Sequence, residues 1–181
     1  RRPAKEGGEE HPPVAVLGDI FMDVNVAGLE ELPAWGGDAL ANSVGLTPGG
    51  SALNTAVVLA DLGTNVRLYS AVGDDDFGTL CAEACAARGV GRPQVVKGET
   101  TGSCVVLSGP QDRAFATARG VIARMTLDHA GFPLSPPKGL RHLHIAGFYN
   151  CPSLPGSLPP LLSLLRSSGC TLSLNPQTDA H

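Results

Sequence analysis

The alternation of strand-like and helical segments is the feature of this chain that most restricts its fold. Strand-like runs occur at 14–17, 66–72, 140–147 and 170–174. Between them, helical segments are expected at about 51–62, 77–88 and 158–168, each followed by a glycine that suits a helix C-terminus. Apolar strands that alternate with helices predict an α/β fold, in which a parallel sheet is covered by helices on both faces.

Two further segments have the pattern of strands with one polar face. From 20 to 26 apolar and polar residues alternate, and Asp23 lies on the polar side. The runs 103–107 and 113–117 are joined by Ser-Gly-Pro-Gln-Asp, which is typical of a hairpin turn. These segments do not fit the buried parallel sheet, so they predict a small separate β-layer. Residues 30–46 are expected to form a loop, with at most one short extended piece before Pro48.

The stretch 47–56, Thr-Pro-Gly-Gly-Ser-Ala-Leu-Asn-Thr-Ala, is the strongest candidate for a binding site. Gly49 and Gly50 allow a sharp turn without a β-carbon that would hold a ligand away. The first helical turn then offers unpaired N–H groups and the positive end of the helix dipole. Asn54, one turn further, can both donate and accept hydrogen bonds. The combination suits a polyhydroxylated ligand, and the alternative is a purely structural turn before a helix.

Three other groups invite a metal-site or redox interpretation. Asp74, Asp75 and Asp76 precede a helix, where capping of the helix N-terminus is favoured over metal binding. His142 and His144 share one face of a strand, and without a third ligand nearby a core or edge role is favoured over zinc. The five cysteines include no Cys-x-x-Cys pair, and Cys81 and Cys85 are expected to be small buried apolar residues.

Composition excludes several classes of function. The chain has 181 residues, 43% of them hydrophobic, which is typical of one globular domain. A net charge of −4 without a basic cluster argues against a nucleic-acid partner. No apolar stretch is long enough to predict a membrane span. Residues 1–13 are expected to be a disordered tail without a secretory signal, and the cysteine usage favours a cytoplasmic location.

Four stretches, taken together and in order, resemble the PfkB or ribokinase-like carbohydrate kinases. They are Gly-Asp-Ile-Phe-Met-Asp at 18–23, Pro-Gly-Gly-Ser-Ala-Leu-Asn-Thr-Ala at 48–56, Val-Gly-Asp-Asp-Asp-Phe-Gly at 72–78 after Leu-Gly at 62–63, and Thr-Gly at 101–102 with the hairpin to 117. The resemblance extends from Val14 to about Gln177. It implies a Rossmann-like αβα sandwich with a β-lid that often forms a dimer interface.

By this resemblance, the chain would be the N-terminal, sugar-binding part of a kinase domain over 14–181, with lid strands at about 20–26 and 103–117. Asp23, Gly49, Gly50 and Asn54 would bind hydroxyl groups of a sugar or sugar-like substrate. The full-length parent would use ATP and Mg²⁺ to phosphorylate that substrate, and would form a homodimer through the lid.

The chain also departs from the family pattern. The family's Gly-Ala-Gly-Asp segment, which supplies the catalytic aspartate, and its Asn-x-x-Glu motif for magnesium do not occur in it. No catalytic residue, ATP site or metal site is therefore expected in this chain, the C-terminal half of the fold is expected to be missing, and the chain alone is predicted to be inactive. Phe21 and Ser51 stand where some ribokinases have asparagine and lysine, which leaves the sugar open. The alternative is a non-catalytic binding or dimerisation module.

Overall fold

The computed structural model describes residues 14–178, and the tail predicted at 1–13 lies outside this range. The helices are α1 (Ser51–Asp61), α2 (Asp76–Ala87) and α3 (Leu158–Ser167), and the short 3-10 turns are η1 (Gly120–Arg124), η2 (Phe148–Asn150) and η3 (Pro155–Ser157). The strands are β1 (Val14–Gly18), β2 (Phe21–Ala27), β3 (Ser43–Gly49), β4 (Val66–Tyr69), β5 (Ala71–Gly73), β6 (Gln94–Val96), β7 (Ser103–Ser108), β8 (Arg113–Ala118), β9 (His142–Ala146) and β10 (Thr171–Asn175).

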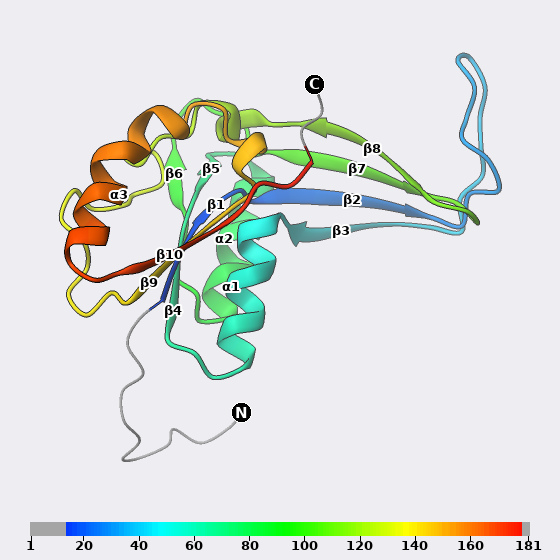
Figure 1. Ribbon diagram of the computed structural model, residues 1–181. Coiled ribbons are helices and arrows are strands. Elements are labelled where there is room, and N and C mark those ends of the chain that lie inside the picture. Colours follow the sequence, from blue (N-terminus) through cyan, green and yellow to red (C-terminus); the bar gives the residue numbers. More distant parts are fainter. Residues whose placement is uncertain (1–13, 179–181) are drawn as a thin grey trace.

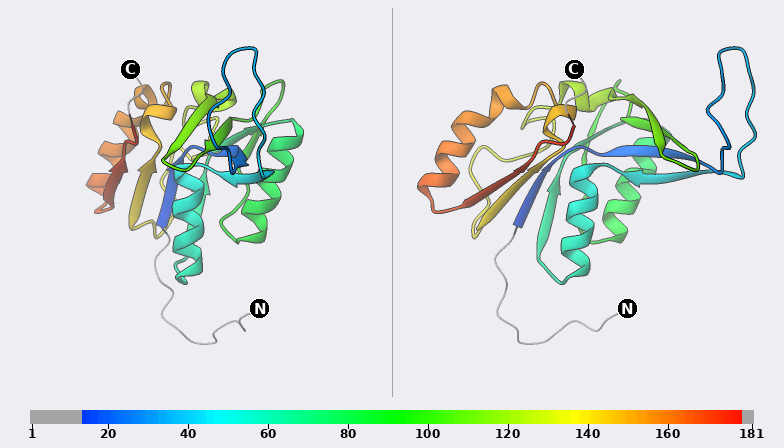
Figure 2. Two further views of the ribbon diagram at one scale, coloured as in Figure 1. Left: turned by 90° about the vertical axis from the view of Figure 1, so that its right-hand side faces the viewer. Right: turned by 45° about the vertical axis from the view of Figure 1, so that its right-hand side comes forward.

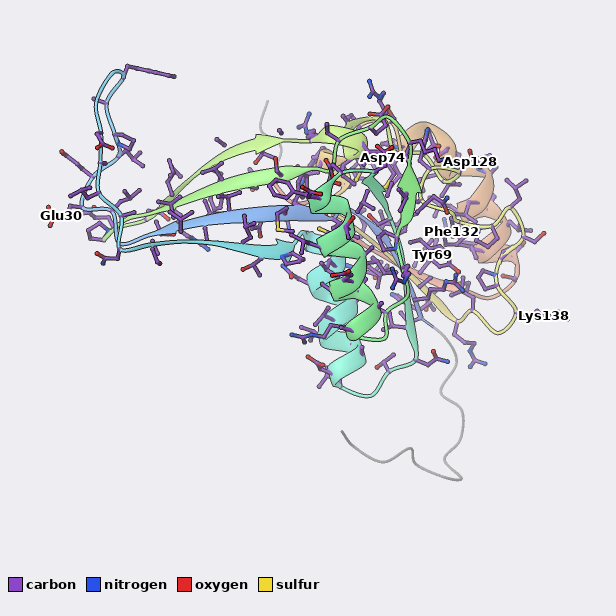
Figure 3. The ribbon with its side chains drawn as sticks, turned by 180° about the vertical axis from the view of Figure 1, so that it is seen from behind. Glu30, Tyr69, Asp74, Asp128, Phe132 and Lys138 are labelled. Atoms are coloured by element: carbon purple, nitrogen blue, oxygen red, sulfur yellow. The ribbon has the colours of Figure 1, made fainter. Side chains whose placement is uncertain are left out.

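The predicted parallel sheet is confirmed, with helices on both faces. Its four strands are all parallel and lie in the order β10-β9-β1-β4. Figure 1 shows α3 on one side of this sheet and α1 and α2 on the other. Along β1 the side chains alternate between two cores: Leu17 packs with the α3 side, and Val16 with the side of α1 and α2. On the α3 side the rings of Tyr69 and Phe132 pack against each other at an angle of 53°, with centroids 4.6 Å apart (Figure 3).

The separate β-layer is also confirmed, and it forms a second four-stranded sheet, the lid, in the order β3-β2-β7-β8. Figure 2 shows the lid extending away from the parallel sheet, with the loop between β2 and β3 at its outer end. β2 pairs with β3 antiparallel and with β7 parallel, so the hairpin β7–β8 is joined to the sheet through β2.

The registers of the lid strands assign its residues to two faces. The apolar lid face carries Val24, Val26, Val44, Leu46, Val105, Leu107, Ala114 and Ala116. The polar lid face carries Asp23, Asn25, Thr47, Cys104 and Thr117, with Val106 and Phe115 further out. The apolar lid face is not fully covered, because Val44 is 67% exposed and Leu46 is 52% exposed.

The sequence expectation was wrong for β3. The segment 30–46 was expected to be loop up to a short extended piece before Pro48, whereas β3 is a seven-residue strand that includes Pro48. β3 lies at the edge of the lid, where proline is tolerated because its missing N–H is not needed by an outer neighbour. The pairing with β2, which no local pattern reveals, makes this segment a strand.

The predicted strand 66–72 divides into β4 and β5 at Ser70. The buried Ser70 hydroxyl donates a hydrogen bond of 2.6 Å to the Gly18 carbonyl, and the Ser70 carbonyl accepts one of 2.9 Å from the Gln94 N–H. β5 thereby leaves β1 and pairs with β6, a strand that the sequence did not predict. β10 forms an edge of the parallel sheet, and its Leu174 is 53% exposed.

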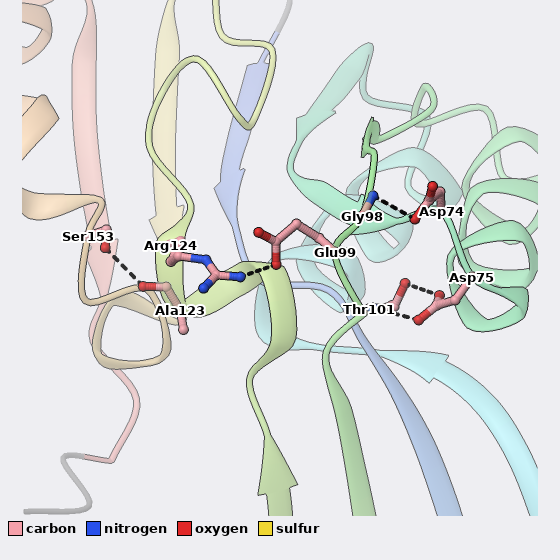
Figure 4. A network of polar contacts seen from close by, with 8 residues as sticks. All are labelled: Asp74, Asp75, Gly98, Glu99, Thr101, Ala123, Arg124 and Ser153. Carbon is pink, nitrogen blue, oxygen red and sulfur yellow. Dashed lines mark hydrogen bonds and ion pairs between the residues drawn. The ribbon is translucent and has the colours of Figure 1, made fainter.

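Of the three carboxylates at 74–76, Asp75 caps α2, so the predicted capping is confirmed for this residue alone. Asp75 is the N-cap and accepts a hydrogen bond of 2.8 Å from the Gly78 N–H. It also accepts hydrogen bonds from the Thr101 N–H at 2.8 Å and from the Thr101 hydroxyl at 2.6 Å (Figure 4). Asp74 accepts one of 3.0 Å from the Gly98 N–H. Partial burial raises the pKa of Asp75, but the hydrogen bonds from Thr101 and Gly78 outweigh burial and hold this pKa below its ordinary value.

We expect the substitution Asp75→Ala to lower the free energy of unfolding by about 2–3 kcal/mol, because a cap and two further hydrogen bonds to a charged group are lost. Because the pKa of Asp75 is lowered in the fold, its contribution is present above the unfolded value of about 4 and is lost as the pH falls through the folded value. Urea unfolding at pH 7 and pH 3 measures both effects. In the control Asp76→Asn a change of about 1 kcal/mol or less is expected, and equal effects of both variants at pH 7 would contradict the capping role.

The cysteines of α2 are buried in the core, and the histidines of β9 contact side chains of β10. Cys81 and Cys85 are fully buried in α2, as predicted, and burial raises the pKa of Cys81 to about 12 and that of Cys85 to about 11. His142 contacts the hydroxyls of Thr171 and Ser173, both at 2.8 Å, and His144 contacts Ser173 at 2.7 Å. These contacts join the inner strand β9 to β10 and give both histidines a structural role within the sheet. No helix among residues 14–178 is long and apolar enough to cross a membrane.

Candidate functional site

The candidate site lies where the lid joins the parallel sheet. β1 ends at Gly18, Asp19 follows, and β2 begins two residues later, so the chain passes here from the parallel sheet into the lid. β3 returns to the same place at Gly49, and α1 begins immediately after Gly50. The end of β9 adds the loop Gly147–Asn150. Open α/β sheets bind ligands outside the carboxyl ends of their strands, which is where these segments meet.

The structure brings together Asp23 and Gly49, two predicted site residues that are far apart in sequence. Gly49 pairs with Phe21 across the lid, and a β-carbon at Gly49 would overlap the carboxylate of Asp23. Glycine at 49 therefore leaves room for that carboxylate. Asp23 itself is half-buried on the polar lid face. Burial raises the pKa of Asp23, and the negative charge of Asp19 raises it further.

Gly50 is required by the packing of the backbone. Its φ is 102°, a conformation that favours glycine, and an added β-carbon would lie 2.8 Å from the Asp19 carbonyl oxygen and 3.0 Å from the Ile20 Cα. The turn thus presses directly against the segment that links β1 to β2. This structural requirement accounts for Gly50 without a ligand, whereas Gly49 is linked to the half-buried carboxylate of Asp23.

The N-terminus of α1 is partly occupied by the chain's own carboxylate. The Ala52 N–H donates a hydrogen bond of 3.0 Å to Oδ1 of Asp19, and the Asn150 side chain donates one of 2.8 Å to Oδ2. Asp19 is only 1% exposed. Burial raises the pKa of Asp19, although the hydrogen bonds from Asn150 and Ala52 oppose this effect. The first turn of α1 is therefore less available to an anion than the sequence indicated.

Asn54 lies exposed on α1, two residues after Ala52, whose N–H bonds to Asp19. Within residues 14–178 its side chain makes no hydrogen bond, so the amide is free for a ligand, while its N–H bonds the Gly50 carbonyl at 3.0 Å. The structure gives no direct contact between Asn54 and Asp23. The neighbouring Ser51 hydroxyl accepts a hydrogen bond of 2.9 Å from the Gln177 side chain, so the segment after β10 also reaches this turn.

Sequence reasoning missed Asp19 and Asn150. Asp19 had only its position after a buried strand as a signal, and a residue at the carboxyl end of such a strand is a candidate for a site. Asn150 lies 131 residues away from Asp19 along the chain and had no local signal. Asp19 and Asn150 come together because β1 pairs in parallel with β9.

The described residues form no cluster of side chains that fits a metal ion. Between residues 14 and 178, no three His, Cys, Asp or Glu side chains come close enough to hold a metal ion. Asp74 and Asp75 accept hydrogen bonds from backbone N–H groups of the fold (Figure 4). An ion pair between Arg124 and Glu99 joins η1 to the same loop (Figure 4).

Comparison with known proteins relates this architecture to carbohydrate kinases. Residues 12–180 match the sequence profile of the pfkB family of carbohydrate kinases. A stretch of 112 residues is 32% identical to the ribokinase of Bacillus subtilis (strain 168), and covers 55% of this chain and 38% of that protein.

Solved structures share the fold at lower identity. The ribokinase of Cryptococcus neoformans var. grubii serotype A in complex with ADP has a TM-score of 0.67 at 23% identity, over 92% of this chain and 50% of that one. The Arabidopsis thaliana ribokinase complexed with ribose and ATP has a TM-score of 0.67 at 22% identity, over 91% and 53%. The Giardia lamblia ribokinase has a TM-score of 0.75 at 14% identity, over 92% and 55%.

The chain spans about half the length of these solved relatives, and the match includes both the parallel sheet and the lid because it covers at least 91% of the chain. The profile match covers nearly the whole chain as well. This chain therefore belongs to the pfkB family of carbohydrate kinases.

Proposed function

We propose that this chain is the sugar-binding part of an ATP-dependent kinase that phosphorylates a hydroxyl group of a sugar or sugar-like compound. The observation that carries the proposal is the half-buried carboxylate of Asp23 above Gly49, at the junction of lid and sheet. A carboxylate there accepts hydrogen bonds from hydroxyl groups, and each such bond contributes on the order of 1–3 kcal/mol. Gly50 and Asn54 complete the proposed substrate site, Gly50 by shaping the turn and Asn54 by its free amide.

The charges around the site support a neutral, polyhydroxylated ligand. Two carboxylates, those of Asp19 and Asp23, lie near the first turn of α1, and Asp19 already accepts the Ala52 N–H. An anionic group brought to this turn would meet like charges, whereas hydroxyl groups can donate to Asp23. Fixing several hydroxyls in this way orients the ligand, and orientation is a large part of catalysis in phosphoryl transfer.

ATP and Mg²⁺ are assigned by this proposal to the full-length parent, since relatives solved with ADP or ATP are about twice as long as this chain. We derive no catalytic step from residues 14–178, in which no group of His, Cys, Asp or Glu side chains could hold a metal ion. The proposal is tested by extending the chain through the rest of its reading frame and titrating neutral and anionic sugars into it by calorimetry. Binding of a neutral sugar that is lost in Asp23→Ala is expected, and saturable binding of anionic sugars alone would contradict the proposal.

The apolar lid face supports a second part of the proposal, a homodimer formed through the lid. This face has eight apolar side chains, with Ser103 as a polar residue at its inner end, and an isolated sheet with an uncovered apolar face is marginal in water. Pairing with the same face of a second copy would cover it symmetrically. The same face would serve the alternative function, a non-catalytic dimerisation module.

We expect the chain to be a dimer at micromolar concentration, and the substitution Leu46→Glu to raise its dissociation constant at least about tenfold by placing a charge on the apolar lid face. Sedimentation equilibrium measures this constant. The control Ser43→Glu introduces the same charge into the same strand on the opposite face and should leave association unchanged. A strictly monomeric wild-type chain, or equal effects of both substitutions, would count against the lid interface.

A further inference from the structure

Asp19 is a buried carboxylate for which the proposed site has no direct use. Its side chain is 1% exposed, so it cannot contact a ligand in the open site. No Arg, Lys or His of the described residues pairs with it, and its partners are the Ala52 N–H at 3.0 Å and the Asn150 amide at 2.8 Å. Burying an ionised group without a cation is unfavourable, so its hydrogen bonds must offset a substantial desolvation cost.

The contacts of Asp19 join three segments that are far apart in sequence. Its backbone carbonyl lies against Gly50, its Oδ1 caps the first turn of α1, and its Oδ2 holds Asn150 at the end of η2. Gly147 is also required here, since its φ is 66° and a β-carbon would overlap the Asp19 carboxyl group. One side chain therefore ties the turn before α1 to the loop that follows β9.

We propose that Asp19 is a positioning residue, whose buried carboxylate fixes the turn at Gly49 and Gly50 relative to Asp23. This inference rests on the proposed function, which makes the junction a substrate site. The positioning role itself is argued only from the contacts of Asp19. The same carboxylate acts on Asp23 through space, since its negative charge contributes to the raised pKa of Asp23.

Few other groups that titrate or carry charge surround this pair. Cys81 of α2 interacts electrostatically with Asp23 and with Asp75. Cys151 interacts with Asp19 and with Arg119 before η1. Burial raises the pKa of both thiols far above neutrality, and arginine stays charged. Below pH 7, the carboxylates of Asp19, Asp23 and Asp75 are therefore the groups of this cluster that change charge.

Two readouts on the 181-residue chain test the proposal without a kinase assay. Amide exchange followed by NMR should be at least about tenfold faster at Ala52 in Asp19→Ala and in Asn150→Ala, because the capping bond is lost or loosened. Exchange at Val16, in the central strand β1, should change much less. A ¹³C-carboxyl titration should show that Asp19→Asn lowers the pKa of Asp23, since a like charge is removed. The control Glu83→Gln, an exposed carboxylate of α2, should change neither readout.

The outcomes separate this inference from the proposed function. Unchanged exchange at Ala52 in Asn150→Ala, together with an unchanged Asp23 titration in Asp19→Asn, would overturn the positioning role. Uniformly faster exchange, equal at Val16 and Ala52, would also overturn it, because it would show a general loss of stability. If Asp19→Ala does not fold, Asn150→Ala and Asp19→Asn still test the positioning role. If the wild-type chain binds no sugar, the proposed function fails while both readouts on Asp19 remain valid.

Discussion

We expect the 181-residue chain alone to transfer phosphoryl groups at least about 10⁴-fold more slowly than a chain extended through the rest of its reading frame. Both chains would be assayed with ATP, Mg²⁺ and a panel of sugars. Phosphoryl transfer needs a positioned base and electrostatic stabilisation of the transferring group. Asp75, in the middle of the carboxylates at 74–76, caps α2 and accepts three hydrogen bonds. No other group between residues 14 and 178 could hold a metal.

A coupled assay that detects ADP measures this difference. The short chain should be assayed alone and mixed with the extended chain, so that an inhibitor in the preparation is recognised. Turnover by the short chain that persists after purification from contaminating kinases would place the active site within residues 14–178 and overturn the assignment. Activity absent from both chains would favour the non-catalytic dimerisation module.

In the extended chain, Asp23→Ala is expected to raise the KM for the sugar between about tenfold and a hundredfold, which corresponds to one or two lost hydrogen bonds to a charged group. Asn54→Ala should act in the same direction and more weakly, because its bonds to the ligand are uncharged. The fold should be retained, since neither side chain is fully buried. Steady-state kinetics and thermal unfolding measure the two effects.

The matched control is Asp38→Ala, which removes an exposed carboxylate from the loop at the outer end of the lid. It should leave the KM unchanged, and so distinguish a local role of Asp23 from a general effect of net charge. Sugar kinetics unchanged in both Asp23→Ala and Asn54→Ala would remove the substrate role of these residues.

Much of the fold could be predicted because local signals agreed with it. Gly63 and Gly89 follow α1 and α2 with positive φ, and Asp75 caps α2 through a bond within one turn. The alternation of residues 20–26 predicted a lid strand with Asp23 on its polar side, and the registers bear this out. Each of these features depends on residues close together in sequence.

The rest depends on contacts between distant segments, which a single sequence does not reveal. Residues 30–46 were predicted to be loop with at most one short extended piece, yet the pairing with β2 makes β3 a strand. Ser70 divides an apolar run because it meets Gly18, 52 residues away. The predicted site residues Asp23 and Gly49 do come together, but the carboxylate that caps α1 belongs to Asp19, and its partner Asn150 carried no local signal.

The central claim is that a sugar binds at the junction of lid and sheet, and mapping its binding by NMR tests this most directly. A neutral sugar titrated into the ¹⁵N-labelled 181-residue chain should shift the amides of residues 19–23 and 47–54. The apolar groove of about 360 Å³ between α3 and Phe132 should be unaffected. Shifts concentrated in that groove, with the amides of Asp23, Gly49 and Asn54 unmoved at saturation, would contradict the account.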